Sequence, residues 1–162
     1  MKKIIALAFA TVITSGVYAQ SNKEDVDDIM KDMYGKSKKE VVAEYMTFTD
    51  TEKMAFWPVY NAFESERKIL GQERFVILDE YSKHYSTLDD AKSADLGKRA
   101  IDNSVALEML NQKYFPKFIT AIGARQAAKY MQIEIYMQNV VRTELQDKIL
   151  FIDELDKSKK KK

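Results

Sequence analysis

The 162-residue sequence contains no cysteine, one histidine, one tryptophan, two prolines and five glycines. The absence of cysteine excludes disulfide bonds, thiol nucleophiles and thiolate metal ligands. The scarcity of glycine and proline argues against a fold built from many turns, and residues with high helix propensity dominate throughout. No segment shows the alternation of apolar and polar residues that is typical of a half-buried strand. The sequence therefore predicts an all-α fold.

Catalytic and cofactor-binding motifs are also missing. The single histidine, His84, follows Glu80 by one helical turn, but a dinuclear carboxylate site in a helix bundle needs a Glu-x-x-His pair from each of two helices. The sequence has no glycine-rich phosphate loop, no metalloprotease signature, and no arrangement of serine, histidine and aspartate that indicates a nucleophile. We therefore expect the protein not to be an enzyme, and we expect no cofactor and no metal site.

Residues 1–19 have the organisation of a secretory signal peptide. Lys2 and Lys3 form a basic start, residues 4–12 form an almost unbroken apolar run, and Ala19 ends a small-residue cleavage signal. The apolar run is too short for a spanning helix, which needs about 20 residues. We therefore predict cleavage after Ala19 and an exported, periplasmic protein, with an uncleaved membrane anchor as the alternative.

We expect the mature chain to form a single all-helical domain, residues 20–156, followed by a lysine-rich tail, residues 157–162. The tail contains five lysines, whereas acidic residues outnumber basic ones in the domain before it. An acidic domain argues against nucleic-acid binding, which requires a basic face. The tail is predicted to be disordered and solvated, and weak contact with an anionic membrane is the alternative interpretation.

Capping signals and glycines divide the domain into helices. Ser37 and Thr49 are each followed three residues later by glutamate, as in a capping box, and Gly35 and Gly123 are placed like glycines that end helices. The last three predicted helices are about 45–54 Å long and must bury an apolar stripe against one another to be stable. We place the helices at residues 24–34, 37–47, 50–85, 89–122 and 124–155.

One stripe of the 50–85 helix differs from an ordinary core seam. Apolar or aromatic residues recur every seven positions from Phe56, and the companion positions four residues further on carry tyrosine and arginine. The arginines either pack their stems at the edge of the seam with their charged ends in water, or they line a basic, aromatic groove that is open to a partner. The methionines also have two interpretations: they fill the core, or they form a pliable binding surface. The candidate binding residues are Phe56, Tyr60, Arg67, Arg74 and Tyr81.

Pro58 lies about two turns into the same predicted helix, directly after Trp57. Proline lacks an amide hydrogen and clashes with the carbonyl of Met54, so we expect a kink there. Pro116 would bend the facing helix in the same way. Two bent helices that cross would produce a curved, cradle-like body; the alternative is a local kink that only allows Trp57 to fit the core.

Two short segments resemble the Leu-Thr-x-x-Gln signature of the Spy/CpxP family of periplasmic stress proteins. Residues 48–52 have phenylalanine in place of leucine and glutamate in place of glutamine, and residues 122–126 keep the aliphatic residue and the glutamine but have glycine in place of threonine. The resemblance covers roughly residues 37–140. A threonine and a glutamate three positions apart cap each other's backbone amides, and the residue before them can pack on the first turn. The motif residues are Phe48, Thr49, Glu52, Ile122 and Gln126.

The resemblance implies a function as well as a fold. It implies a cradle-shaped homodimer of long, antiparallel, kinked helices that binds unfolded or aggregation-prone proteins in the periplasm without ATP. It also implies an alternative, a regulatory or sensory module of the envelope stress response that docks on a membrane-bound partner. Metal binding, a third implied property, is disfavoured because the sequence has one histidine and no cysteine.

Overall fold

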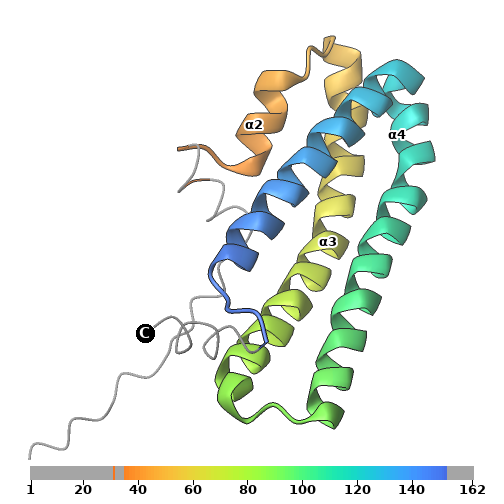
Figure 1. Cartoon of the computed structure of the whole chain (residues 1–162). Coiled ribbons are helices and arrows are strands. Elements are labelled where there is room, and N and C mark those ends of the chain that lie inside the picture. Colours follow the sequence, from red (N-terminus) through yellow and green to blue (C-terminus); the bar gives the residue numbers. More distant parts are fainter. Residues whose placement is uncertain (1–30, 32–34, 153–162) are drawn as a thin grey trace, which may run out of the picture.

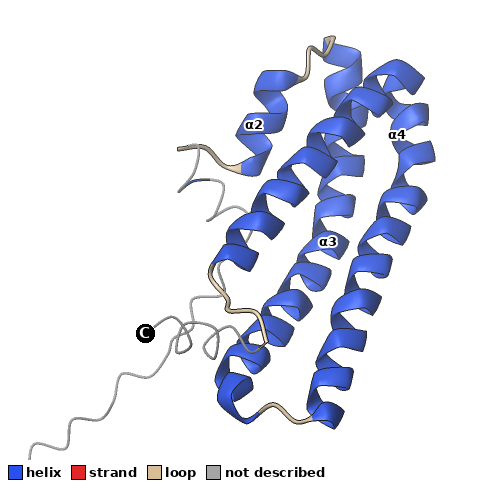
Figure 2. Cartoon of the chain, in the orientation of Figure 1, coloured by secondary structure: helices blue, strands red, loops and turns tan. Residues whose placement is uncertain are grey.

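The computed structural model describes residue 31 and residues 35–152, and in this part of the chain the regular structure is helical throughout (Figures 1 and 2). The prediction of an all-α fold is therefore confirmed. The predicted signal peptide, nearly all of the predicted 24–34 helix and the lysine-rich tail lie outside the described residues. None of the helices in the described ranges is long and apolar enough to cross a membrane.

The described chain forms a short helix followed by two long ones. These are α2 (Lys38–Tyr45), α3 (Asp50–His84) and α4 (Asp90–Asp147), with a single 3-10 turn, η1 (Tyr85–Thr87), between the long helices. In Figure 1, α3 and the first half of α4 (residues 90–122) run side by side in opposite directions. After Gly123 the second half of α4 (residues 124–147) turns back and descends between α2 and α3 (Figure 1). The finer prediction of a kinked, cradle-like hairpin stays a prediction.

The helix starts agree with the capping signals in the sequence. The Thr49 hydroxyl accepts a hydrogen bond from the amide of Glu52 at 3.3 Å, and the Glu52 carboxylate accepts one from the amide of Thr49 at 2.8 Å. The Thr49 amide and the Thr49 hydroxyl both donate to the Glu52 carboxylate, and these two hydrogen bonds lower the pKa of Glu52. Ser37 and Glu40 form the same reciprocal box at the start of α2. Each box satisfies two backbone donors that a helix end leaves unpaired.

The chain reverses direction at Gly123, not at either proline. Gly123 has φ 77° and ψ 158°, and it is the only residue inside α3 or α4 with non-helical backbone angles. Positive φ is accessible to glycine because it has no Cβ. Pro58 and Pro116 both lie within continuous helix. The final helix also ends earlier than predicted, at Asp147 instead of residue 155.

The core is an aromatic cluster near the end of the bundle where Gly123 lies. Phe56, Phe63, Phe118 and Tyr130 are each 0 % exposed and contact one another, with the rings of Phe118 and Tyr130 centred 4.5 Å apart. Aromatic pairs at such distances add stability beyond the area they bury. Because these residues come from α3 and from both halves of α4, their burial holds the three segments together.

Candidate functional site

A cluster of buried charges joins α2 to α3 and to the second half of α4. The Lys38 Nζ lies 2.6 Å from Glu64 Oε1 and 2.7 Å from Glu134 Oε1, and Arg67 Nε donates to both carboxylate oxygens of Glu64 at 3.0–3.1 Å. The Lys38 and Glu134 side chains are 1 % and 0 % exposed. Two cations therefore face two anions in the interior. We refer to Lys38, Glu64, Arg67 and Glu134 as the ion cluster.

The positive charges of the ion cluster keep Glu64 ionised. Burial alone raises the pKa of Glu64, but the nearby positive charges of Lys38 and Arg67 and their hydrogen bonds outweigh burial, so the pKa is lowered. Glu64 is therefore an ionised carboxylate with no tendency to exchange protons near neutral pH. A carboxylate of this kind does not suit general acid or base chemistry, which needs a pKa near the working pH.

Two neighbours complete the hydrogen bonding of Glu134. Gln138 Nε2 donates to Glu134 Oε1 at 2.8 Å, and the Tyr130 hydroxyl donates to Glu134 Oε2 at 3.3 Å. Burial, and then the negative charge of Glu134, raise the pKa of Tyr130 well above its usual value. The neutral hydroxyl is therefore a permanent donor. The network satisfies buried polar groups and fixes the position of α2, which is a structural role.

The structure corrects the predicted placement of three candidate binding residues. Phe56, Tyr60 and Arg67 are 0 %, 4 % and 3 % exposed, so they lie in the interior and do not line an open groove in this conformation. Arg67 also does not keep its charged end in water, because that end is bound to Glu64. Both interpretations of Arg67 assumed a solvated guanidinium. Neither anticipated a carboxylate on the same helix, three residues earlier, as its partner.

The other two candidate residues, Arg74 and Tyr81, are partly exposed. Tyr81 donates a hydrogen bond from its hydroxyl to the carbonyl of Leu150 at 2.7 Å, and Tyr85 does the same to the carbonyl of Phe151 at 2.7 Å. The two tyrosines thus tether the segment that follows α4 to the end of α3. Arg74 lines a small pocket between α3 and the two halves of α4.

The two motif segments meet at one end of the bundle although they are far apart in the sequence. Gln126 Nε2 donates to the carbonyl of Thr47 at 3.0 Å, directly before the first motif segment. Phe48 packs against Phe56 with ring centroids 4.6 Å apart, and Ile122 is 5 % exposed in the same core. The motif residues therefore fix where the chain enters α3 and where α4 turns back.

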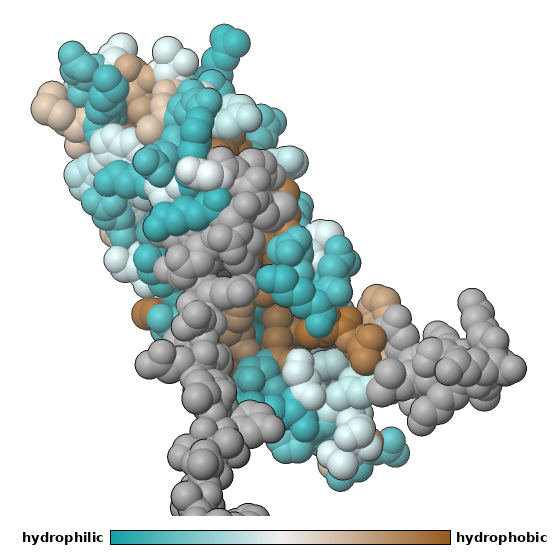
Figure 3. Space-filling model, turned by 90° about the vertical axis from the view of Figure 1, so that its left-hand side faces the viewer, coloured by the Kyte–Doolittle hydropathy of each residue, from teal (hydrophilic) through white to brown (hydrophobic). Residues whose placement is uncertain are grey.

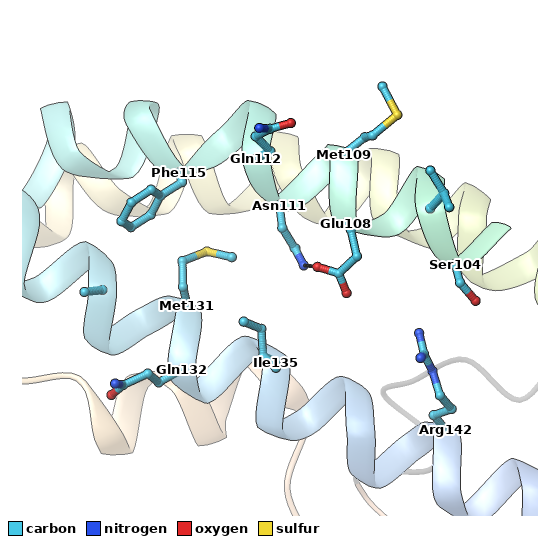
Figure 4. Close-up of a pocket in the computed structure, with 12 residues that line it drawn as sticks. Ser104, Glu108, Met109, Asn111, Gln112, Phe115, Met131, Gln132, Ile135 and Arg142 are labelled. Atoms are coloured by element: carbon cyan, nitrogen blue, oxygen red, sulfur yellow. Dashed lines mark hydrogen bonds between the residues drawn. The ribbon is translucent and has the colours of Figure 1, made fainter. Parts of the chain in front are cut away.

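A groove with a volume of about 800 Å³ lies between the two halves of α4 (Figure 4). Phe115 from one wall and Met131 and Ile135 from the other point toward the space between the walls in Figure 4. Polar residues, including Ser104, Glu108 and Arg142, lie along it toward one end. We refer to this feature as the α4 groove.

The α4 groove is accompanied by large apolar side chains that are exposed to solvent. Val105 and Met109 on the first half of α4 are 53 % and 63 % exposed, and Ile135 on the second half is 42 % exposed. On the face that lies on the left of Figure 1, apolar surface is interspersed with hydrophilic surface along the middle of the body (Figure 3). Clusters of exposed apolar side chains are typical of interaction sites.

Sequence reasoning missed the ion cluster and the α4 groove. The hydrophobic pattern gave no indication that Lys38 or Glu134 would be buried, because both residue types are usually solvated. The need of the long helices to bury an apolar stripe did not indicate which apolar residues would remain uncovered. Among the described residues, no group of three or more histidine or acidic side chains is arranged to hold a metal ion.

Comparison with known proteins gives no match to any family model, curated protein or solved structure. The Spy/CpxP resemblance therefore stays a prediction that depends on the motif residues alone.

Proposed function

We propose that the protein is an exported, ATP-independent chaperone-like protein that binds unfolded or aggregation-prone proteins in the periplasm. The observation that carries the proposal is the α4 groove, an elongated hollow of about 800 Å³ with apolar residues on both walls. The Spy/CpxP resemblance is consistent with this function. Binding without ATP must be reversible, so the surface has to be apolar enough to retain a client and shallow enough to release it.

The composition of the groove supports binding of varied apolar segments. Met109 and Met131 bring flexible, polarizable side chains that adapt to different partners. Glu108 and Arg142 place charges of both signs beside the apolar walls, which suits extended polypeptides that mix apolar and charged residues. Each buried methylene of a client contributes about 0.8 kcal/mol, so a few side chains suffice for weak, reversible binding.

The proposal includes a homodimer in which the long helices form a concave cradle. The exposed apolar residues on both halves of α4 provide a surface that a second copy can cover at its edge, leaving the remainder for clients. In this arrangement the turn at Gly123 and the prolines in α3 and α4 set the curvature of each protomer. Phe56, Tyr60 and Arg67 then act as the rigid base of the cradle and not as its client-facing surface.

The function is tested by light scattering of an aggregating client protein, with and without the purified protein at several molar ratios and without nucleotide. We expect suppression of aggregation at near-stoichiometric amounts. The double variant Val105→Lys, Ile135→Lys places a charge on each wall of the groove at positions that are exposed. It should keep its helical circular dichroism spectrum and lose most of the suppression.

The matched control is Met54→Lys, Val76→Lys, which introduces the same charges at two exposed apolar positions of α3 outside the groove. Equal suppression by both double variants would show that the α4 groove does not bind clients. Absence of suppression by the unmodified protein across several clients would reject the chaperone function. A single saturable partner captured from envelope extract would then favour the regulatory alternative. Light scattering coupled to size-exclusion chromatography tests the dimer separately.

A further inference from the structure

A small pocket between α3 and both halves of α4 is lined by Arg67, Arg74 and Arg142. Arg67 is bound to Glu64, whereas no carboxylate among the described residues pairs with Arg74 or Arg142. The pocket has a volume of about 60 Å³, and Arg74 from α3 and Arg142 from the second half of α4 both line it. In the described part of the chain neither arginine forms an ion pair or hydrogen bond with another residue, and Arg74 Nε is buried without a partner. The same pocket is lined by the polar side chains of Asn103 and Gln138.

This pairing of like charges is unfavourable unless something else occupies the pocket. Burial, and then the positive charge of Arg142, lower the pKa of Arg74, so the surroundings disfavour the charged form of this side chain. Arg67, which is buried on the same helix, differs because Glu64 accompanies it. A buried donor without a partner is destabilising because it has lost its hydrogen bonds to water. An anion placed between the two guanidinium groups would satisfy the donor and neutralise the repulsion.

A larger apolar pocket adjoins this one at Arg74. Arg74 is shared with a neighbouring pocket of about 260 Å³ whose walls include Ile77, Leu78, Leu96 and Ile149. Tyr81, held by its hydrogen bond to Leu150, forms part of the wall near the end of α3. Arg74 lines both pockets and Arg142 lines the small one. This arrangement is complementary to a molecule with an anionic head for the small pocket and a single apolar tail for the larger one. A free inorganic anion would leave the apolar pocket empty.

We propose that Arg74 and Arg142 bind the carboxylate of a single-chain fatty acid whose apolar tail lies in the adjoining pocket. Guanidinium groups donate paired hydrogen bonds that match the two oxygens of a carboxylate. The tail gains the free energy of apolar burial with each methylene that leaves water. Arg142 also lines the α4 groove, whereas Arg74 and the residues of the tail pocket do not. Direct titration with a fatty acid therefore tests this site separately from the suppression of client aggregation.

The test is isothermal titration of the purified protein with three probes, the fatty-acid probe being kept below its micelle concentration. Dodecanoate has the head and the tail, dodecanol has the tail alone, and acetate has the head alone. We expect dodecanoate to bind with one-to-one stoichiometry and dodecanol and acetate to bind at least ten-fold more weakly. The double variant Arg74→Met, Arg142→Met, which keeps apolar stems of similar length, should bind dodecanoate at least ten-fold more weakly than the unmodified protein.

The control variant is Arg125→Met, which removes an exposed arginine of α4 and should bind dodecanoate like the unmodified protein. Equal affinity for dodecanoate and dodecanol would show that the arginines do not bind the carboxylate. Equal affinity for dodecanoate and acetate would show that the apolar tail does not contribute to binding. Either result would overturn the proposal. Unchanged binding by the double variant would also overturn the proposal. If the double variant loses its helical spectrum, the comparison of the three probes on the unmodified protein decides the question alone.

Discussion

The Nζ of Lys38 lies 2.7 Å from the carboxylate of Glu134, which is 96 positions later in the sequence. Lys38 is the first residue of α2, and Glu134 belongs to the second half of α4. Both side chains are almost completely removed from water. The ion pair therefore connects the short first helix to the last helical segment, and Glu64 connects the same lysine to α3.

Replacing Lys38 with methionine should destabilise the protein strongly. Removing one partner of a buried ion pair leaves an uncompensated charge and costs about 3–5 kcal/mol. Urea unfolding followed by circular dichroism measures the loss, and adding Glu134→Gln to Lys38→Met should recover part of it. Lys36→Met is the matched control, because Lys36 pairs with Glu44 at the surface and its loss should leave the unfolding midpoint nearly unchanged. A similar small effect of Lys38→Met would contradict the buried ion pair.

Gly123→Ala should destabilise the protein, whereas Gly97→Ala should not. Gly123 has φ 77°, and a left-handed conformation costs a residue with a Cβ about 1–2 kcal/mol. Gly97 lies in regular helix with no atom within 4 Å of an added Cβ, so alanine there should stabilise the protein by about 0.5–1 kcal/mol. Thermal unfolding of the two variants should shift in opposite directions. Shifts of the same sign would show that the reversal at Gly123 does not require positive φ.

The free energy of unfolding should fall as the pH is lowered, and part of that loss should come from the protonation of Glu64. Lys38 and Arg67, acting against the opposing effect of burial, hold the pKa of Glu64 below its ordinary value of 4.5. The unfolded chain then binds the proton more readily than the folded one, so the contribution is present above pH 4.5 and is lost as the pH falls through the lowered pKa.

The measurement is the free energy of unfolding from urea titrations between about pH 6 and 3. Glu64→Gln should be less stable than the unmodified protein at pH 6 but should lose less stability on acidification. Glu73→Gln, at an exposed position of the same helix, is the control and should follow the unmodified protein. A Glu64→Gln curve parallel to that of the unmodified protein would mean that Glu64 is not held in its charged form.

Removing the hydroxyls of Tyr81 and Tyr85 should release the segment after α4. Each hydroxyl donates to a backbone carbonyl, of Leu150 and Phe151 respectively, and one such hydrogen bond contributes about 1 kcal/mol. Amide hydrogen exchange of residues 148–152 should therefore be several-fold faster in Tyr81→Phe, Tyr85→Phe. Tyr45→Phe, at an exposed position of α2, should leave this exchange unchanged. Unchanged exchange in the double variant would show that other contacts hold the segment.

The helix boundaries were predictable because the signals that set them are local. Thr49 and Glu52 are three residues apart, so their capping box forms within one turn whatever the rest of the chain does. Gly123 likewise marks a break by its own conformational freedom. The end of the last helix was predicted too late because its apolar pattern continues past Asp147, whereas Tyr81 and Tyr85 bind the chain there in a non-helical conformation.

The sequence by itself determined an all-helical chain, the starts of α2, α3 and α4, and the position of the reversal between two long helical segments. Only the tertiary structure decided that Lys38, Glu64, Arg67 and Glu134 would be buried together, that Arg74 and Arg142 would share a pocket without a carboxylate, and that a groove would remain open between the halves of α4. The physical reason is one of range. Caps and propensities act within a turn of helix, whereas the burial and pairing of a charge depend on segments that are distant in the sequence and meet only when the chain folds.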